Sequence, residues 1–200
     1  MRGGSNIAKF VGRGTRAGGR RKLLLLAAFA ISPVVASYAA YYWFAPAKRV
    51  NYGELLETRP VPEIAGTLAD GSRFSLTDLR GRWLLLVVTS GECDEACLRA
   101  LSATRQARTI QGREQDRVLR VWLRTANGSP PAREVLALHP GLVAAHADRD
   151  ELARLPIDAG DSGILLIDPL GNLVLRYGAD ADIRRLANDL GRLLSASQVG

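Results

Sequence analysis

The sequence is poor in the residues that build most catalytic and metal sites. In 200 residues it has only two cysteines, Cys93 and Cys97, and only two histidines, His139 and His146. The spacing of the two histidines matches no compact metal motif. A glycine-rich phosphate loop and a serine elbow, which mark nucleotide-binding proteins and α/β-hydrolases, are also missing. The chemistry that remains centres on the two thiols.

Acidic residues are missing from the first 22 positions, which carry seven lysines and arginines. The formal net charge of +7 therefore belongs to this tail. No charged residue occurs from Leu23 to Phe44. A helix over these residues, at ~1.5 Å per residue, is about 33 Å long and spans a hydrocarbon core of roughly 30 Å. We expect a basic cytoplasmic tail over 1–22 and a transmembrane helix over 23–44.

The position of the basic tail predicts the orientation of the chain. By the positive-inside rule the tail stays in the cytoplasm and the residues after the helix are exported. We therefore expect a single-pass protein of the inner (cytoplasmic) membrane with its C-terminal domain in the periplasm. Aromatic residues form an interfacial belt at the far end of the span. They are Tyr38, Tyr41, Tyr42, Trp43 and Phe44.

Two other interpretations compete with a membrane span, and a third concerns the tail. A cleaved signal peptide has a shorter apolar core of ~7–15 residues, and the Ala-x-Ala sequence that follows the run is Ala45-Pro46-Ala47. A buried helix of a soluble domain fits worse, because nothing polar interrupts the run. The glycines and arginines of the tail suggest RNA or anionic lipid, but a disordered topology signal accounts for them, and we expect no nucleic-acid partner.

After the anchor we expect a polar, proline-containing linker over 45–62 and one domain over 63–197. Trp83–Thr89 is apolar on both faces and predicts a central strand covered by helices. Apolar and small residues at near-helical spacing predict a helix from Asp94 to about Gln111. The order of strands and helices predicts an α/β fold with a mixed sheet. The other expected elements are a β-like stretch over Glu63–Ser75, strands at Val118–Leu123, Ile164–Ile167 and Leu173–Tyr177, and helices at 131–138, 149–155 and 182–194.

Several motifs together resemble one family. They are Asp70-Gly71, Ser75-Leu76-Thr77-Asp78-Leu79-Arg80-Gly81-Arg82-Trp83, the Cys93-x-x-x-Cys97 pair, and Leu165-Leu166-Ile167-Asp168-Pro169-Leu170-Gly171. With the anchor upstream, the chain resembles the membrane-anchored thioredoxin-fold proteins of the Sco/SenC type. The resemblance implies a thioredoxin-like fold and a role in assembling the copper centre of cytochrome c oxidase, by copper binding or by thiol reduction. It also implies a protein partner, such as an oxidase subunit or another assembly factor. Some of the motifs also occur in TlpA-like oxidoreductases and in peroxiredoxins.

The spacing of the cysteines leaves two chemistries open. Thiols at i and i+4 on a helix share a face, but their Cβ atoms lie about 5–6 Å apart. A disulfide requires a Cβ separation of about 3.5–4.5 Å. A Cys93–Cys97 bridge therefore needs Cys93 in the loop before the helix, or a distorted first turn. Two thiolates that converge on one soft metal ion fit the spacing equally well.

Three carboxylates flank the thiols, those of Glu92, Asp94 and Glu95. They oppose thiolate formation and act against the helix dipole, which favours it. This tilts the pair towards Cu(I) binding or slow exchange rather than fast nucleophilic chemistry.

The chain departs from the Sco pattern at the third metal ligand. Members of the family complete the copper site with a histidine before the third strand, and the corresponding stretch here, 155–163, has none. Gly160 stands nearest to the ligand's place, and Asp158 and Asp161 offer only hard oxygen atoms. We expect His139 and His146 to be surface loop residues. The metal site would then hold Cys93, Cys97 and an unknown third ligand.

Three functions stay open for the pair. The first is a Sco-like protein that handles copper, and the second is a membrane-tethered thiol-disulfide oxidoreductase of the TlpA kind. The third is a thioredoxin-fold scaffold without catalysis. A purely structural disulfide is disfavoured because a four-residue step constrains the unfolded chain little. A peroxidase is disfavoured because Leu86 stands where peroxiredoxins have a proline.

Overall fold

A computed structural model describes residues 16–43, 51–90, 92–125, 133–158 and 162–197. The chain divides into two units, 1–49 and 50–200, which are described separately. The tail before residue 16, the Ala45-Pro46-Ala47 sequence and Gly160 with Asp161 lie outside the described residues.

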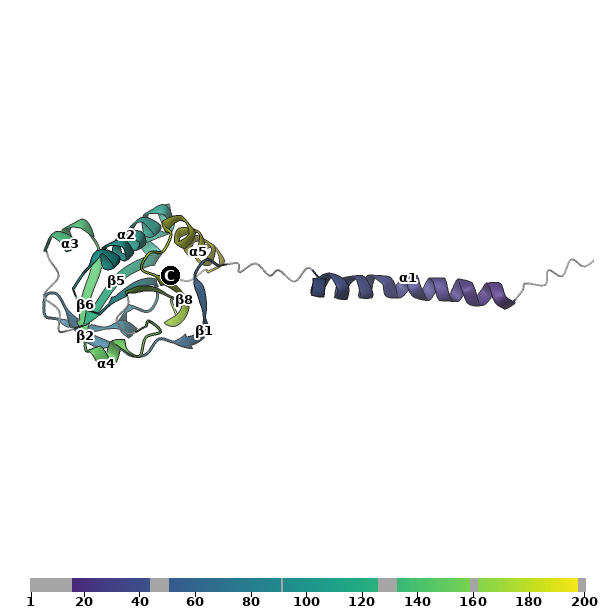
Figure 1. Ribbon diagram of the computed structural model, residues 1–200, viewed down its shortest axis with the longest axis horizontal. Coiled ribbons are helices and arrows are strands. Elements are labelled where there is room, and N and C mark those ends of the chain that lie inside the picture. Colours follow the sequence, from purple (N-terminus) through teal and green to yellow (C-terminus); the bar gives the residue numbers. More distant parts are fainter. Residues whose placement is uncertain (1–15, 44–50, 91, 126–132, 159–161, 198–200) are drawn as a thin grey trace, which may run out of the picture. The chain divides into compact units, whose positions relative to one another are not determined.

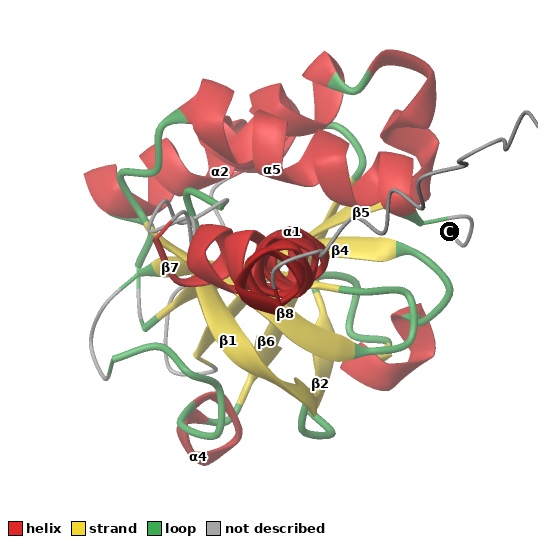
Figure 2. Ribbon diagram, turned by 90° about the vertical axis from the view of Figure 1, so that its right-hand side faces the viewer, coloured by secondary structure: helices red, strands yellow, loops and turns green. Residues whose placement is uncertain are grey.

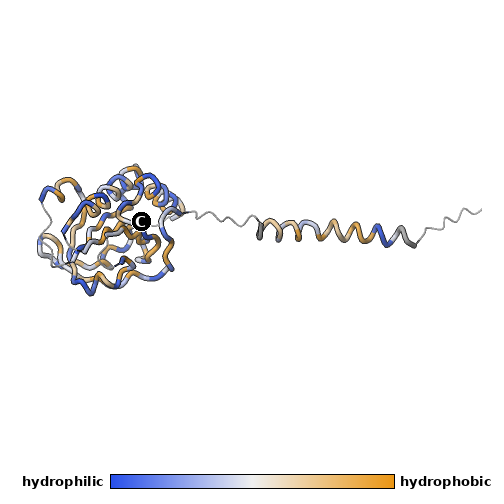
Figure 3. Tube along the Cα trace, in the orientation of Figure 1, coloured by the Kyte–Doolittle hydropathy of each residue, from blue (hydrophilic) through white to orange (hydrophobic). Residues whose placement is uncertain are grey.

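The first unit contains one long helix, α1 (Arg16–Trp43), with Pro33 inside it. Its segment Gly19–Ala40 has a mean hydropathy of 2.1 and is long and apolar enough to cross a membrane. Figure 3 shows that the helix is hydrophobic over most of its length and hydrophilic near its N-terminal end. Membrane helices tolerate a proline of this kind. The helix overlaps the segment 23–44 in which the sequence predicted a membrane span.

The second unit is built on an eight-stranded mixed sheet with the strand order β1-β8-β7-β4-β5-β6-β2-β3. Strand β4 pairs parallel with β5 and antiparallel with β7, so it lies inside the sheet. All seven of its residues are buried, as its apolar sequence predicted. The strands are β1 (Glu54–Pro60), β2 (Ala65–Leu68), β3 (Arg73–Ser75), β4 (Trp83–Thr89), β5 (Val118–Thr125), β6 (Leu142–Ala147), β7 (Gly163–Ile167) and β8 (Asn172–Gly178).

Two helices cover one face of this sheet, α2 (Glu95–Ile110) and α5 (Ile183–Ala196), and they lie side by side (Figure 2). Their apolar residues pack on Trp122, Ile164 and Leu166. The opposite face carries a second apolar cluster that includes Leu86 and Leu165. The short helices are η1 (Leu76–Leu79), η2 (Gly112–Arg117), α3 (Arg133–Leu138) and α4 (Arg149–Leu152) (Figure 1). The expected α/β fold, with helices flanking a mixed sheet, is confirmed.

Two strands lie where the sequence reading placed none. Strand β1 occupies Glu54–Pro60, within the segment 45–62 that we read as a linker, and β6 occupies Leu142–Ala147. The residues of β1 are both polar and apolar and are mostly exposed, because among the described strands it pairs only with β8, at the edge of the sheet. Strand β6 is rich in alanine and has little β-branched sequence, which normally marks a strand. Both strands are defined by distant pairing rather than by local pattern.

Candidate functional site

Cys93 and Cys97 form a disulfide, with their Cα atoms 5.1 Å apart. Cys93 precedes α2, whereas Cys97 lies in the first turn of that helix. Placing one cysteine before the helix solves the spacing problem of two thiols at i and i+4. Cys97 is fully buried and Cys93 is only partly buried. The two sulfur atoms therefore differ in their access to a partner.

Asp94 fixes the start of α2 between the two cysteines. Its side-chain Oδ1 accepts a hydrogen bond from the Cys97 amide at 2.9 Å, and its carbonyl accepts one from Leu98. Such a cap uses one of the unpaired amides of the first turn. The next carboxylate, Glu95, pairs with Arg99 at 2.7 Å. The carboxylates that the sequence placed around the thiols therefore also organise the helix.

A buried cation lies in the strand beside the disulfide loop. Arg124, at the end of β5, is in register with Thr89, the last residue of β4. Its guanidinium lies 5.8 Å from the ring centre of Trp122, whose Nε1 donates to Thr89 Oγ1 at 3.0 Å. Burial lowers the pKa of Arg124 from its usual value. Along the sequence, the basic residue nearest to the cysteines is Arg99. The signal that could have revealed Arg124 is the alternation of Arg120, Trp122 and Arg124 in an otherwise apolar strand.

Neither histidine is a surface loop residue, which corrects that expectation. His139 is buried, with 4% of its surface exposed, and His146 lies in β6 in register with Arg124. The turn at His139 packs under α2, because Arg120 donates to Pro140 O at 2.6 Å and Arg105 donates to Leu138 O. These contacts come from residues far away in the sequence, so the local pattern did not reveal the burial.

The described residues supply no complete copper site. Among them, no three histidine, cysteine or carboxylate side chains come together as a metal site would require. His139 precedes β6 and so lies at the opposite edge of the sheet from Cys93, while His146 is separated from β4 by strand β5. The disulfide also holds both sulfur atoms in a bond. Only the reduced pair offers soft donors that fit Cu(I), and it offers two of them.

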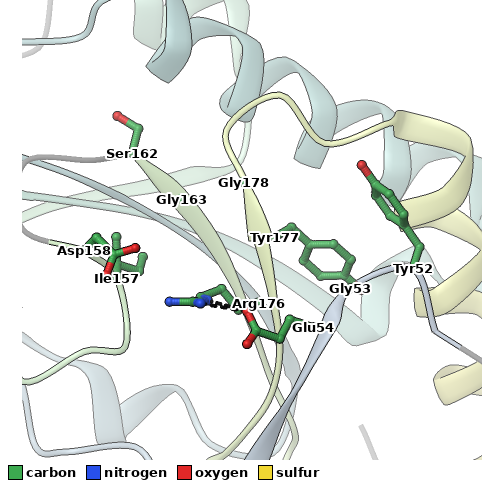
Figure 4. Close-up of a pocket in the computed structure, with 10 residues that line it drawn as sticks. All are labelled: Tyr52, Gly53, Glu54, Ile157, Asp158, Ser162, Gly163, Arg176, Tyr177 and Gly178. Atoms are coloured by element: carbon green, nitrogen blue, oxygen red, sulfur yellow. Dashed lines mark hydrogen bonds and ion pairs between the residues drawn. The ribbon is translucent and has the colours of Figure 1, made fainter. Parts of the chain in front are cut away.

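A cavity of about 350 Å³ opens at the edge of the sheet where β4 ends. Figure 4 shows Tyr52 and Tyr177 on one side, Ile157 and Asp158 on the other, and the ion pair between Glu54 and Arg176. The remaining lining residues are Gly53, Ser162, Gly163 and Gly178. No local sequence pattern predicts this cavity, because its walls come from β1 and the residues before it, β7, β8 and the loop before β7.

One buried carboxylate fixes the tyrosine wall of the cavity. Asp189 Oδ2 accepts from the amides of Tyr52 and Gly53, each at 2.9 Å, and from the Tyr177 hydroxyl at 3.3 Å. Burial, and then the charge of Asp189, raise the pKa of Tyr177 above its usual value. A Cβ on Gly53 would lie 2.5 Å from the Tyr177 ring, so only glycine fits there. The wall is thus rigidly joined to α5.

Residues 83–197, from β4 to the end of α5, match one protein family, the transmembrane-like, thioredoxin-like C-terminal domains. The chain belongs to this family. The match covers more than half of the chain and includes both cysteines. Among curated proteins, no relative matches the sequence.

Solved structures place this transmembrane-like, thioredoxin-like domain among two groups of proteins. Copper-bound ScoI of Arabidopsis thaliana is similar with a TM-score of 0.57 and 17% identity, over 70% of this chain and 100% of that one. Yeast Sco1 is similar with a TM-score of 0.57 and 17% identity, over 69% of this chain and 96% of that one. The thioredoxin domain of a Bacteroides vulgatus thiol-disulfide oxidoreductase is similar with a TM-score of 0.56 and 18% identity, over 70% of this chain and 99% of that one. At these identities the likeness establishes the thioredoxin-like fold, and it confirms the resemblance to Sco proteins at that level.

Proposed function

We propose that the chain is a membrane-tethered thiol-disulfide exchange protein whose Cys93–Cys97 pair acts on cysteines of an exported partner. The observation that supports this most directly is the asymmetry of the disulfide. Cys93 is partly exposed before α2, and Cys97 is buried in its first turn. An attacking thiolate reaches the exposed sulfur, and the buried one is the leaving group.

The exchange step balances without a further reactant. A thiolate of the partner attacks Cys93 Sγ, the Cys93–Cys97 bond breaks, and Cys97 leaves as a thiolate that takes up a proton. The second thiol of the partner then attacks the mixed disulfide and releases Cys93. The partner loses two electrons and two protons, which the cysteine pair gains, and the reverse sequence reduces a partner disulfide.

We further propose that this chemistry takes place on the exported side of the inner membrane. The basic tail over 1–22 supports a cytoplasmic N-terminus, and hence a periplasmic domain. A disulfide persists in that compartment, whereas the cytosol keeps thiols reduced.

The role of each cysteine is tested with single variants of the full chain in a neutral detergent. With Cys97→Ser, the free Cys93 thiol should form a stable mixed disulfide with glutathione disulfide, seen by mass spectrometry. With Cys93→Ser, the buried Cys97 should react roughly tenfold more slowly. Equal rates for the two variants, or no adduct with either, would refute the proposed roles.

Copper handling during assembly of cytochrome c oxidase is the second candidate. The two sulfur atoms of the reduced pair are soft donors, and the nearby carboxylates favour a cation. Anaerobic titration of the reduced chain with Cu(I) should show one equivalent bound, and the oxidised chain and the Cys93→Ser variant should bind none. Failure of the reduced chain to bind one equivalent in a thiol-dependent way excludes this candidate and leaves the exchange activity intact.

A further inference from the structure

The cavity lies where β7 begins and β8 ends, at the same edge of the sheet as the end of β4, the strand that leads into the disulfide. Val88, at the end of β4, is in register with Gly163, and Gly163 is in register with Gly178. Both glycines line the cavity. Gly163, in β7, lies one strand spacing of about 5 Å from the end of β4, and Gly178, in β8, lies two spacings or about 10 Å from it.

The charges in the cavity leave one carboxylate without a partner. Each nitrogen of the Arg176 guanidinium donates a hydrogen bond, Nε and Nη2 to Glu54 Oε2 at 3.0 and 2.7 Å and Nη1 to Pro156 O. Asp158 is exposed, and within the described residues its carboxylate has no hydrogen bond or ion pair. With two carboxylates and one guanidinium, the lining carries a net negative charge.

The apolar part of the lining fits a long side chain. The rings of Tyr52 and Tyr177 lie 6.1 Å apart at 40°, and Ile157 faces them across the cavity (Figure 4). Lysine and arginine bury their methylene stems along such surfaces and keep the charged group near a carboxylate. The Tyr52 ring already has the guanidinium of Arg185 5.3 Å from its centre, so Asp158 is the group that would hold the incoming charge. A volume of about 350 Å³ is large enough for one such side chain with its neighbouring backbone.

We propose that this cavity binds a lysine or arginine side chain of the partner polypeptide, three to five residues from the cysteine that reacts with Cys93. This inference rests on the proposed exchange function. An extended peptide advances about 3.3–3.6 Å per residue and so covers the ~10 Å between the ends of β4 and β8 in about three residues. The range extends to five residues because Cys93 lies four positions beyond Thr89, the last residue of β4. The chain thus selects partners whose reactive cysteine has a basic residue at that distance.

The test uses two peptides that differ only in charge at this distance. Each has a central pair of cysteines in disulfide linkage, and one has lysine and the other glutamate at the fourth position on both sides. We expect the reduced full chain, in neutral detergent, to reduce the lysine peptide about two- to fivefold faster than the glutamate peptide. Equal rates would overturn the proposal.

A matched pair of variants separates the cavity from general attraction between charges. Asp158→Asn should remove most of the lysine preference. Asp78→Asn makes the same change of charge on an exposed carboxylate of η1, before β4 and so at the opposite edge of the sheet, and it should leave the preference unchanged. An equal loss of preference in both variants would mean long-range attraction only and would contradict a binding site in the cavity.

Peptides with serine in place of both cysteines test the cavity without any redox step. The labelled lysine peptide should bind the wild-type chain more tightly than it binds Asp158→Asn, as measured by fluorescence anisotropy. If this difference is seen but no peptide is reduced, the exchange function fails and the cavity assignment stands. If the peptides are reduced without a lysine preference and the serine peptides bind equally, the cavity assignment fails alone.

Discussion

At the scale of single residues, Arg120 and His139 are buried side by side with their pKa values lowered. Arg120 has 3% of its surface exposed, and burial, with Arg108 and Arg105 nearby, lowers its pKa to about 10. Burial, followed by the charges of Arg120 and Arg105, lowers the pKa of His139. A second positive charge beside Arg120 is therefore unfavourable, and the folded domain holds His139 neutral.

His139 should make the domain less stable in mild acid. The unfolded chain takes up a proton on this histidine near its usual pKa of about 6.5, and the folded chain does so only at lower pH. The unfolding free energy should therefore fall by up to about 1 kcal/mol between about pH 6.5 and pH 5.5. Urea titrations across this range measure it.

The control is the other histidine. His139→Gln should flatten the acid dependence, whereas His146→Gln should keep it. If both variants retain the full dependence of the wild-type chain, His139 does not cause it.

At the scale of elements, the residue that caps α2 also determines where Cys93 lies relative to the helix. The sequence predicted the strand Trp83–Thr89 with the observed bounds and the helix within one residue at each end, because strong local patterns specify both. It left open whether Cys93 would lie inside the helix. The Asp94 side chain decides this, because its hydrogen bond to the Cys97 amide makes Asp94 the cap and leaves Cys93 outside.

Two substitutions at Asp94 separate capping from charge. Asp94→Ala removes the cap and should lower the unfolding free energy of the oxidised chain by about 1 kcal/mol. Asp94→Asn keeps an acceptor for the Cys97 amide and should lower the unfolding free energy by less than Asp94→Ala does. Both variants remove a negative charge beside the thiols and should raise the rate at which iodoacetamide alkylates the reduced chain at neutral pH. Unchanged alkylation in both variants would show that the carboxylate does not restrain the thiols.

At the scale of the whole molecule, charge and hydropathy separate an anchor from a thioredoxin-like unit. The domain carries arginines as well, but arginines far from a membrane helix have little effect on its orientation. Arg20, Arg21 and Lys22 lie next to the apolar segment and should therefore determine which side the domain reaches.

Reversing these three charges to glutamate should reduce the fraction of chains with an exported domain. Protease accessibility of the domain in spheroplasts measures that fraction. The matched control reverses three exposed arginines of the domain, Arg82, Arg113 and Arg184, and should leave the orientation unchanged. Full export of the triple tail variant would contradict the proposed topology.

The sequence by itself determined the features that depend on neighbouring residues. Composition marked the apolar helix, a continuous apolar run marked β4, and the two cysteines after that strand marked the candidate site. Only the tertiary structure decided what surrounds the disulfide. Parallel pairing of β4 with β5 places Arg124 beside Thr89, the last residue before the disulfide loop. The cavity forms where β7 begins and β8 ends next to the start of β1. Pairings such as Glu54 with Arg176 join residues more than a hundred positions apart, and no local pattern encodes them.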